Sequence, residues 1–327
     1  MCDPNQYPKL QHPFMDGLKE VPQSKAKDLK KIKTWMANQP HLPVISDEYI
    51  HLFLHACFYN QDKTKHTIET YFTIRASTPS IFADRNPHSE SMNYMLTLAN
   101  VFRLPKKTPE GYRVIMYVVR ESDTTEYVFS DAMKGFCMYN DTVISEEGLI
   151  EGYIVIFDMN YLKLGHLARV SLPALRAFMI YIQEAHPVRL KAVHVINTTA
   201  FIKHTMRILQ PMIRTEIIGL LKFHRGNKPD GIPIEILPKD YGGEAPSSEE
   251  LRSDMYELRD KYAFWLKESV YFVADETKRV KKSSWWSIFG NNNTAPINNN
   301  TTESVHGQSQ QNIVYNDSPG FRRLEID

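Results

Sequence analysis

The strongest indication of the fold comes from Lys191 to Gly243, with the sequence KAVHVINTTAFIKHTMRILQPMIRTEIIGLLKFHRGNKPDGIPIEILPKDYGG. It begins with a short apolar run that is typical of a β-strand, and it ends with a second strand-like run, IPIEILP. Between them lies a Met- and Ile-rich segment of helix length, Thr199 to His224. This alternation predicts an α/β fold and raises the question of what the apolar face of the helix covers.

One side of the Thr199 to His224 segment is apolar. Residues spaced three or four apart form the stripe, namely Ile202, Met206, Leu209, Ile213, Ile217 and Leu220, widened by Phe201, Ile208 and Met212. Pro211 should end the first helix, and a second helix is expected to begin there. The spacing alone favours a core helix packed on a sheet, and a lid over an apolar cavity is the alternative.

The rest of the chain predicts four regions. Helical periodicity dominates residues 1–90, where Asp62 is expected to cap a helix that ends at Thr78. Strand-like runs such as RVIMYVV and GYIVIFDM alternate with helix-length stretches over residues 91–246, which predicts a mixed, largely parallel sheet flanked by helices. Residues 247–282 are expected to form a closing helix, and the Asn-, Ser- and Thr-rich residues 283–327 a disordered tail.

Composition narrows the class of protein. The chain has 327 residues, of which 42% are hydrophobic and 24% charged, as in ordinary soluble domains. A formal net charge of +1 gives no indication of nucleic-acid binding. The three cysteines are scattered, and no signal-peptide core or run of about 18 apolar residues is present. We expect a cytoplasmic, monomeric protein without metal or cofactor.

Sequence motifs of common enzyme classes are absent, including GxGxxG, GxxxxGK[ST], HExxH and GxSxG. Asp158, at the end of a predicted strand, is a candidate catalytic acid, but a turn or cap aspartate is preferred because no partner base is evident. His51 and His55 have metal-ligand spacing without a third ligand. His194 fits a hydrogen-bonded strand residue better than a ligand.

Several strings, in this order, resemble the CRAL-TRIO family of lipid-binding proteins, and in particular insect tocopherol-transfer-like and retinaldehyde-binding-like members. They are FLHACFY (53–59), GYIVIFDMNYL (152–162), HPVRLKAVHVIN (186–197), the Leu209-Gln210-Pro211 junction and ILPKDYGGE (236–244). The resemblance implies a helical N-terminal module and a lipid-binding domain with a mobile lid helix over an apolar cavity. It favours the lid interpretation for Thr199 to Leu209.

The resemblance also implies roles for individual residues. Those expected to line a lipid pocket are Tyr139, Tyr153, Phe157, Leu164, Phe178, Tyr181, Val193, Ile202, Ile208 and Leu209. Those expected in the lid or its hinge are Phe201, Met206, Pro211 and Met212. Each could equally be a core residue. A mixture of tyrosines and aliphatic side chains suits a long apolar ligand with one polar end.

Basic residues suggest two further contacts. Family members bind phosphoinositide headgroups through a basic cluster, of which this chain keeps only half; the candidates are Arg189, Lys191, Arg207 and Arg214. The segment KRVKKSSWWSIF, Lys278 to Phe289, combines cations with Trp285, Trp286 and Phe289. It is either a membrane anchor or a segment that folds back onto the domain.

The function expected from the resemblance is that of a non-enzymatic carrier, which encloses one hydrophobic lipid beneath a gate helix and exchanges it during transient contact with membranes. Tocopherol-, retinoid- and phospholipid-like ligands all fit. A lipid-sensing adaptor without transfer activity is the alternative, and an enzyme acting through Asp158 is a third. Transfer of lipid between vesicles would separate the carrier from the adaptor.

Overall fold

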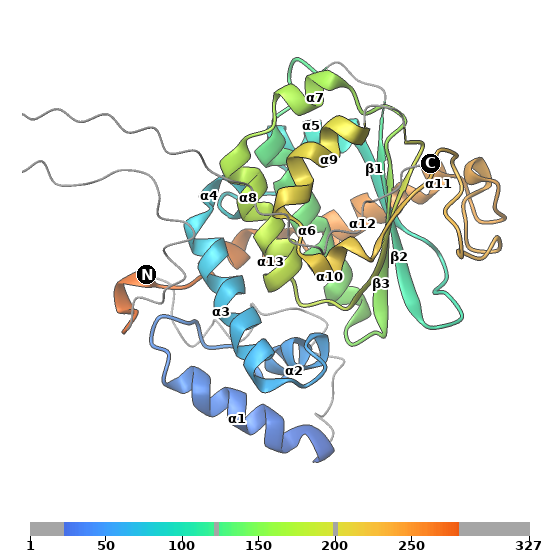
Figure 1. The fold of residues 1–327 in the computed structure, drawn as a ribbon. Coiled ribbons are helices and arrows are strands. Elements are labelled where there is room, and N and C mark those ends of the chain that lie inside the picture. The colour runs from blue at the N-terminus through green and yellow to red at the C-terminus, as the bar shows by residue number, and fades with distance from the viewer. Residues whose placement is uncertain (1–22, 121–123, 199–201, 281–327) are drawn as a thin grey trace, which may run out of the picture. The chain divides into compact units, whose positions relative to one another are not determined.

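The computed structural model describes residues 23–120, 124–198 and 202–280 (Figure 1). These residues belong to one compact unit that ends at Val280. Phe201, Trp285, Trp286 and Phe289 lie outside the described residues, as does the predicted tail. The domain limits expected from the sequence stay predictions.

Four helices form the N-terminal part: α1 (Ala26–Ala37), α2 (Asp47–Ala56), α3 (Gln61–Ser77) and α4 (Pro79–Phe82). The Ser46 side chain accepts a hydrogen bond from the backbone N–H of Tyr49 and so caps α2. Asn60 caps α3 by accepting from the backbone N–H of Lys63 at 2.9 Å. The predicted cap, Asp62, instead lies in the first turn of α3, where its negative charge favours the helix dipole.

A five-stranded sheet forms the centre of the remaining chain, with its strands adjacent in chain order. They are β1 (Ala99–Arg103), β2 (Tyr112–Val119), β3 (Gly152–Asp158), β4 (Leu190–Ile196) and β5 (Leu221–Phe223). The β1 strand pairs antiparallel with β2, and all other pairs are parallel. The predicted mixed, largely parallel sheet is confirmed, although β1 and β5 lie where no strand was predicted.

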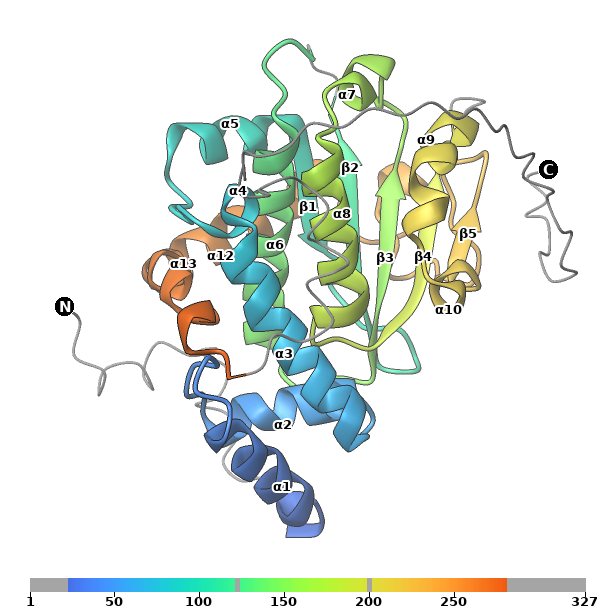
Figure 2. The same cartoon turned by 60° about the vertical axis from the view of Figure 1, so that its left-hand side comes forward.

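Helices cover one face of this sheet (Figures 1 and 2). They are α5 (Glu90–Leu98), α6 (Phe129–Glu147), α8 (Leu172–Ile180) with the π-helical segment Tyr181–Ala185, and α9 (Ile202–Leu209). The short α7 (Leu164–Ala168) lies in the connection between β3 and α8. No described helix is long and apolar enough to cross a bilayer.

The opposite face of the sheet is covered by a segment without regular structure. Ile232, Ile236, Leu237 and Tyr241 pack against side chains of β1 to β4 in one buried cluster. The prediction of a strand for IPIEILP was wrong, because Pro233 and Pro238 have no N–H to donate to a ladder and break any strand here. Ile232, Ile236 and Leu237 of this run are buried, whereas Ile234 is 49% exposed.

The segment that opened the sequence analysis is more divided than predicted. After α9 come a 3₁₀ turn (Gln210–Met212), α10 (Thr215–Ile218) and β5. The interruption expected at Pro211 is confirmed. The second helix begins only at Thr215, and the last residues form a strand because Leu221 and Phe223 pair with β4 and bury their side chains beside Val195.

The closing region consists of three short helices where one was predicted: α11 (Ser248–Leu251), α12 (Ser253–Lys261) and α13 (Ala263–Glu268). A capping box between Ser247 and Glu250 starts the first. Beyond them the chain returns to the N-terminal helices, where Ala274 N–H donates to the Phe72 carbonyl at 3.0 Å. The C-terminal end of the described chain therefore contacts α3 in the N-terminal part.

Candidate functional site

A cavity of about 360 Å³ lies between the sheet and its helical layer. Its floor comes from β3 and β4, where Tyr153, Val155, Phe157, Val193 and Val195 point to the same side. Side chains alternate along a strand, so every second residue of each strand reaches this face. The predicted common face of Tyr153, Val155 and Phe157 is therefore confirmed.

Helix α9 forms one wall of the cavity. Its apolar residues Ile202, Met206 and Leu209 line the cavity, while Lys203 and Arg207 are exposed on the other side. The first two pack with Val195, and Leu221 and Phe223 of β5 join that cluster. An amphipathic helix of eight residues thus separates an apolar interior from solvent.

Most residues expected in a pocket line this cavity. Seven do so, namely Tyr153, Phe157, Phe178, Val193, Ile202, Ile208 and Leu209. Leu164 does not, because it lies on α7 with 67% of its surface exposed. Tyr181 is fully buried against Tyr71 and Phe82 of the N-terminal helices. Tyr139 lines a second cavity, on the other side of α6.

The turn after α9 is held by one side chain. The Gln183 amide donates to the Met212 carbonyl at 3.0 Å and accepts from the Arg214 backbone N–H at 2.8 Å. Met212, expected at the hinge, therefore contributes a backbone contact, and Pro211 lies in the 3₁₀ turn beside it. Gln183 also lines the cavity, so the cavity wall and the turn share this residue.

Two of the four basic candidates are engaged in packing. The Arg189 Nε–H donates to the His55 carbonyl at 2.8 Å, and its guanidinium lies 4.3 Å from the centre of the Phe58 ring. Lys191 lies over the Tyr112 ring, and its side chain runs so close to Gly152 that a Cβ there would clash. These contacts join the start of β4 to α2, β2 and β3.

The other two candidates lie on α9 and in the turn that follows it. Arg214 pairs with Glu184 and Glu216, at 3.4 Å each, whereas Arg207 is exposed on α9. Partners on both sides reduce the positive charge that Arg214 offers to an anion.

Hydrogen bonds distinguish between the alternative roles of Asp158 and His194. Asp158 is buried and accepts from Asn160 N–H at 2.9 Å, Asn197 Nδ2 at 2.8 Å and Tyr241 OH at 2.7 Å. This is the preferred turn aspartate. His194 Nδ1 lies 3.0 Å from His224 Nε2, which agrees with a hydrogen-bonded strand residue.

The two helical histidines have separate partners. His51 meets the Tyr59 hydroxyl and His55 the Ile150 carbonyl. Within the described residues no group of three or more His, Cys, Asp or Glu side chains could hold a metal ion.

Among the polar residues that line the cavity wall, Tyr153 was predicted as a pocket residue, whereas His186 and Thr205 were not. The Tyr153 hydroxyl, His186 Nδ1 and Thr205 Oγ1 are buried and make no hydrogen bond within the described structure. Burial lowers the pKa of His186 to about 4, so its imidazole is neutral at physiological pH. A neutral imidazole and two hydroxyls suit an uncharged polar group. Thr205 was predicted only as part of the lid range Thr199 to Leu209. His186 was named only as part of HPVRLKAVHVIN, a string that resembles the CRAL-TRIO family.

Comparisons with known proteins agree with this geometry. Residues 99–243 match the model of the CRAL/TRIO domain, and residues 21–92 match that of a Pinta-like UBA domain. The alpha-tocopherol transfer protein-like protein of Homo sapiens is 23% identical over 236 residues, which cover 70% of this chain and 68% of that protein. Clavesin-1 of Xenopus laevis is 21% identical over 70% of this chain and 71% of its own length.

A solved structure, the crystal structure of Sfh5, aligns with 79% of this chain and 93% of its own, at 10% identity and a TM-score of 0.38. The family match covers every strand of the sheet and both sides of the cavity. The part of the chain from residue 99 to residue 243 belongs to the CRAL/TRIO family of lipid-binding and lipid-transfer proteins.

Proposed function

We propose that this protein carries one hydrophobic molecule in the cavity over β3 and β4, and exchanges it at a membrane surface when α9 moves aside. The observation that supports this is the cavity of about 360 Å³, which is bounded by the sheet, α8 and the amphipathic α9. Pockets of this size accept molecules of drug size and bury most of their surface.

Affinity would come from burial of apolar surface. Removing hydrocarbon from water is favourable by about 25 cal/mol per Å². The floor and wall offer valine, isoleucine, leucine, methionine and phenylalanine side chains, and these do not discriminate strongly among similar apolar ligands. The polar groups of Tyr153, His186 and Thr205 would orient the ligand, because they could donate hydrogen bonds to one of its hydroxyl or carbonyl groups or accept a hydrogen bond from its hydroxyl.

Release requires an opening on the α9 side. The described contacts of α9 are mainly apolar, and its outer side carries Lys203, His204 and Arg207. Cations approach anionic headgroups, and an apolar face can exchange its contacts with the sheet for contacts with lipid. A membrane surface would therefore lower the cost of moving α9.

A single substitution in the floor tests the proposal. Val155→Phe places a ring in the cavity on a strand position that favours aromatic residues, and overpacking of about 1–3 kcal/mol should reduce retained lipid roughly tenfold. The matched control is Val44→Phe, because Val44 is exposed on the N-terminal part and lines neither cavity. The measurement is extraction of bound lipid followed by mass spectrometry, together with transfer between vesicles.

Three outcomes are informative. Loss of bound lipid and of transfer in Val155→Phe, with both retained in Val44→Phe, supports the carrier. Equal lipid content in the two variants contradicts it. Lipid binding without any transfer by the unmodified protein would indicate the adaptor instead.

A further inference from the structure

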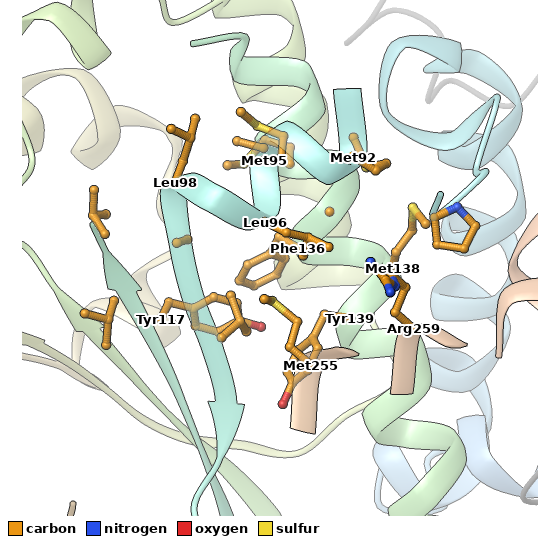
Figure 3. A pocket seen from close by; sticks show the side chains of 18 of the residues that line it. Met92, Met95, Leu96, Leu98, Tyr117, Phe136, Met138, Tyr139, Met255 and Arg259 are labelled. Atoms are coloured by element: carbon orange, nitrogen blue, oxygen red, sulfur yellow. The ribbon is translucent and has the colours of Figure 1, made fainter. Parts of the chain in front are cut away.

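A second cavity, of about 260 Å³, lies over the other end of the same sheet face (Figure 3). Side chains from α5, α6, α12, β1 and β2 line it, including Met95, Phe136 and Met255. Its floor residues Val101 and Tyr117 share the sheet face of Tyr153 and Phe157. Helix α6 thus divides one continuous floor into two compartments.

The two compartments share a wall at one end of α6. Six residues line both: Tyr127, Met133, Phe136, Phe157, Leu162 and His166. Three of them lie just before α6 or in its first two turns, and Phe157 lies near the carboxyl end of β3. The compartments therefore meet near the N-terminus of α6 and diverge along its two sides. A molecule with two branches fits this arrangement better than a straight one.

The second compartment is suited to hydrocarbon. Asn140 donates to the Tyr117 hydroxyl at 2.6 Å, and the Tyr139 hydroxyl donates to Asp254 at 2.7 Å, so the polar atoms of both tyrosines are bound elsewhere. Methionine side chains are flexible and adapt to irregular apolar shapes; those in this wall are Met92, Met95, Met133, Met138 and Met255. Arg259 also lines this compartment, and its guanidinium donates to Asp260 and Asn93. A headgroup would therefore find few free partners here, whereas an acyl chain would find apolar contacts.

A polar group stands where the compartments meet. His166 is 4% exposed, its Nδ1 accepts from the Lys163 backbone N–H at 3.0 Å, and the neutral ring then carries its proton on Nε2 as a donor. The ring packs edge to face on Tyr127, with centroids 4.9 Å apart. An ester or hydroxyl at the branch point of a lipid is the group that such a donor recognises.

We infer that the ligand is a two-chain lipid, which places one chain in the cavity beneath α9 and the other in the compartment between α5, α6 and α12, on either side of α6. This inference rests on the proposed function and specifies its ligand class. A single-chain ligand would leave the second compartment empty.

Gly135 offers a direct test. It lines the second compartment only, and a Cβ added there meets no atom within 4 Å. Gly135→Leu therefore fills the compartment without a clash, and it replaces a glycine inside α6 by a strong helix former. Gly135→Ala is the matched control, because it gives a similar gain in helix propensity but adds only one methyl group. Thermal unfolding of both variants verifies that they fold.

The probes are 1-oleoylglycerol and 1,2-dioleoylglycerol, which share a polar end and differ in chain number. Each protein is incubated with phosphatidylcholine vesicles that contain both probes in equal amounts, and the bound lipid is extracted and quantified. We expect the unmodified protein and Gly135→Ala to retain the two-chain probe preferentially. In Gly135→Leu the ratio of two-chain to one-chain probe should fall roughly tenfold, while one-chain binding is kept.

An unchanged ratio in Gly135→Leu, or retention of the one-chain probe alone by the unmodified protein, overturns the inference but leaves the carrier proposal intact. Retention of neither probe contradicts both. As a second measurement, a diacylglycerol with a photoreactive group in one chain should label peptides from α5 or α12 as well as from α8 or α9. Labelling of α8 and α9 alone would also overturn the inference.

Discussion

Gln183 and Arg214 are joined by a hydrogen bond of 2.8 Å, in which the Gln183 side-chain oxygen accepts from the Arg214 backbone N–H. The same amide donates to the Met212 carbonyl at 3.0 Å. Because Gln183 belongs to the π-helical segment behind the cavity, it ties the turn after α9 to a part of the fold that does not belong to the lid. The turn after α9 is therefore restrained by two specific hydrogen bonds, and α9, the proposed lid, adds apolar contacts.

Removing the two hydrogen bonds of Gln183 should speed ligand exchange. Gln183→Leu removes both bonds at a similar side-chain volume. Each bond contributes about 1 kcal/mol, so the barrier should fall by about 2 kcal/mol and the transfer rate between vesicles should rise roughly thirtyfold. The amount of bound lipid at equilibrium should change little. A stopped-flow transfer assay with a fluorescent diacylglycerol measures the rate.

The control for this variant is Gln210→Leu, since Gln210 is exposed in the same turn. It should transfer at the rate of the unmodified protein. Equal rates in both variants would show that Gln183 does not restrain the lid.

Stability should depend on pH through buried histidines. Burial lowers the pKa values of His186 and His194 to about 4, and for His194 the neighbouring His224 adds to the effect. In the unfolded chain both return to about 6.5, so the unfolded state binds more protons between these values. The free energy of unfolding should fall as the pH falls from about 6.5 to about 4.

His194→Asn tests this dependence, because Asn places a polar atom near the position of Nδ1 without titrating. Each proton contributes a slope of about 1.4 kcal/mol per pH unit within the window. Urea unfolding at pH 7 and pH 5 should show a smaller loss of stability in the variant than in the unmodified protein. Identical losses would contradict the assignment.

The sequence predicted the class of the fold well where periodicity was strong. The alternation in GYIVIFDM placed Tyr153, Val155 and Phe157 on one face, and the spacing in the opening segment separated Ile202 and Met206 from Lys203. These patterns reflect burial, and burial can be predicted from whether each residue is apolar or polar. The same kind of pattern predicted a strand for IPIEILP, which its prolines prevent, although Ile232, Ile236 and Leu237 are buried on the sheet.

Other features depend on contacts between distant residues and have no local signal. The three-residue β5 strand exists only because β4 lies beside it, and the restraint by Gln183 joins positions 31 residues apart. Tyr181 carried a pocket assignment by resemblance, yet helix α3 covers it. The second compartment could not be predicted, because it depends on where α6 lies over the sheet and periodicity does not indicate this position.

The joint between the N-terminal helices and the sheet domain contains buried charge. Arg85 is fully buried and donates to Asp141 at 2.5 Å and to Ser269 at 2.6 Å, while Arg75 lies 3.4 Å from the same carboxylate. Asp141→Asn removes the negative charge between two buried cations, which should lower the free energy of unfolding by about 3–5 kcal/mol. Asp62→Asn is the control, because Asp62 is exposed. Denaturant unfolding that gave equal stabilities would contradict this account of the joint.

The basic and aromatic segment from Lys278 onward gives a prediction for membrane association. If Trp285, Trp286 and Phe289 anchor the protein, a chain that ends at Ser283 should bind anionic vesicles several-fold more weakly, with a larger difference at low salt. Vesicle sedimentation at two salt concentrations measures this. Equal binding of the two chains would place membrane contact elsewhere, with α9 as the next candidate.

We expect the cavity beneath α9 to hold a hydrophobic ligand. Native mass spectrometry of the purified protein, followed by lipid extraction, is the most direct test. The expected result is a mass increment of one lipid molecule per chain, which is strongly reduced in Val155→Phe and retained in Val44→Phe. A protein that is consistently empty, and that stays empty after incubation with vesicles, would contradict it.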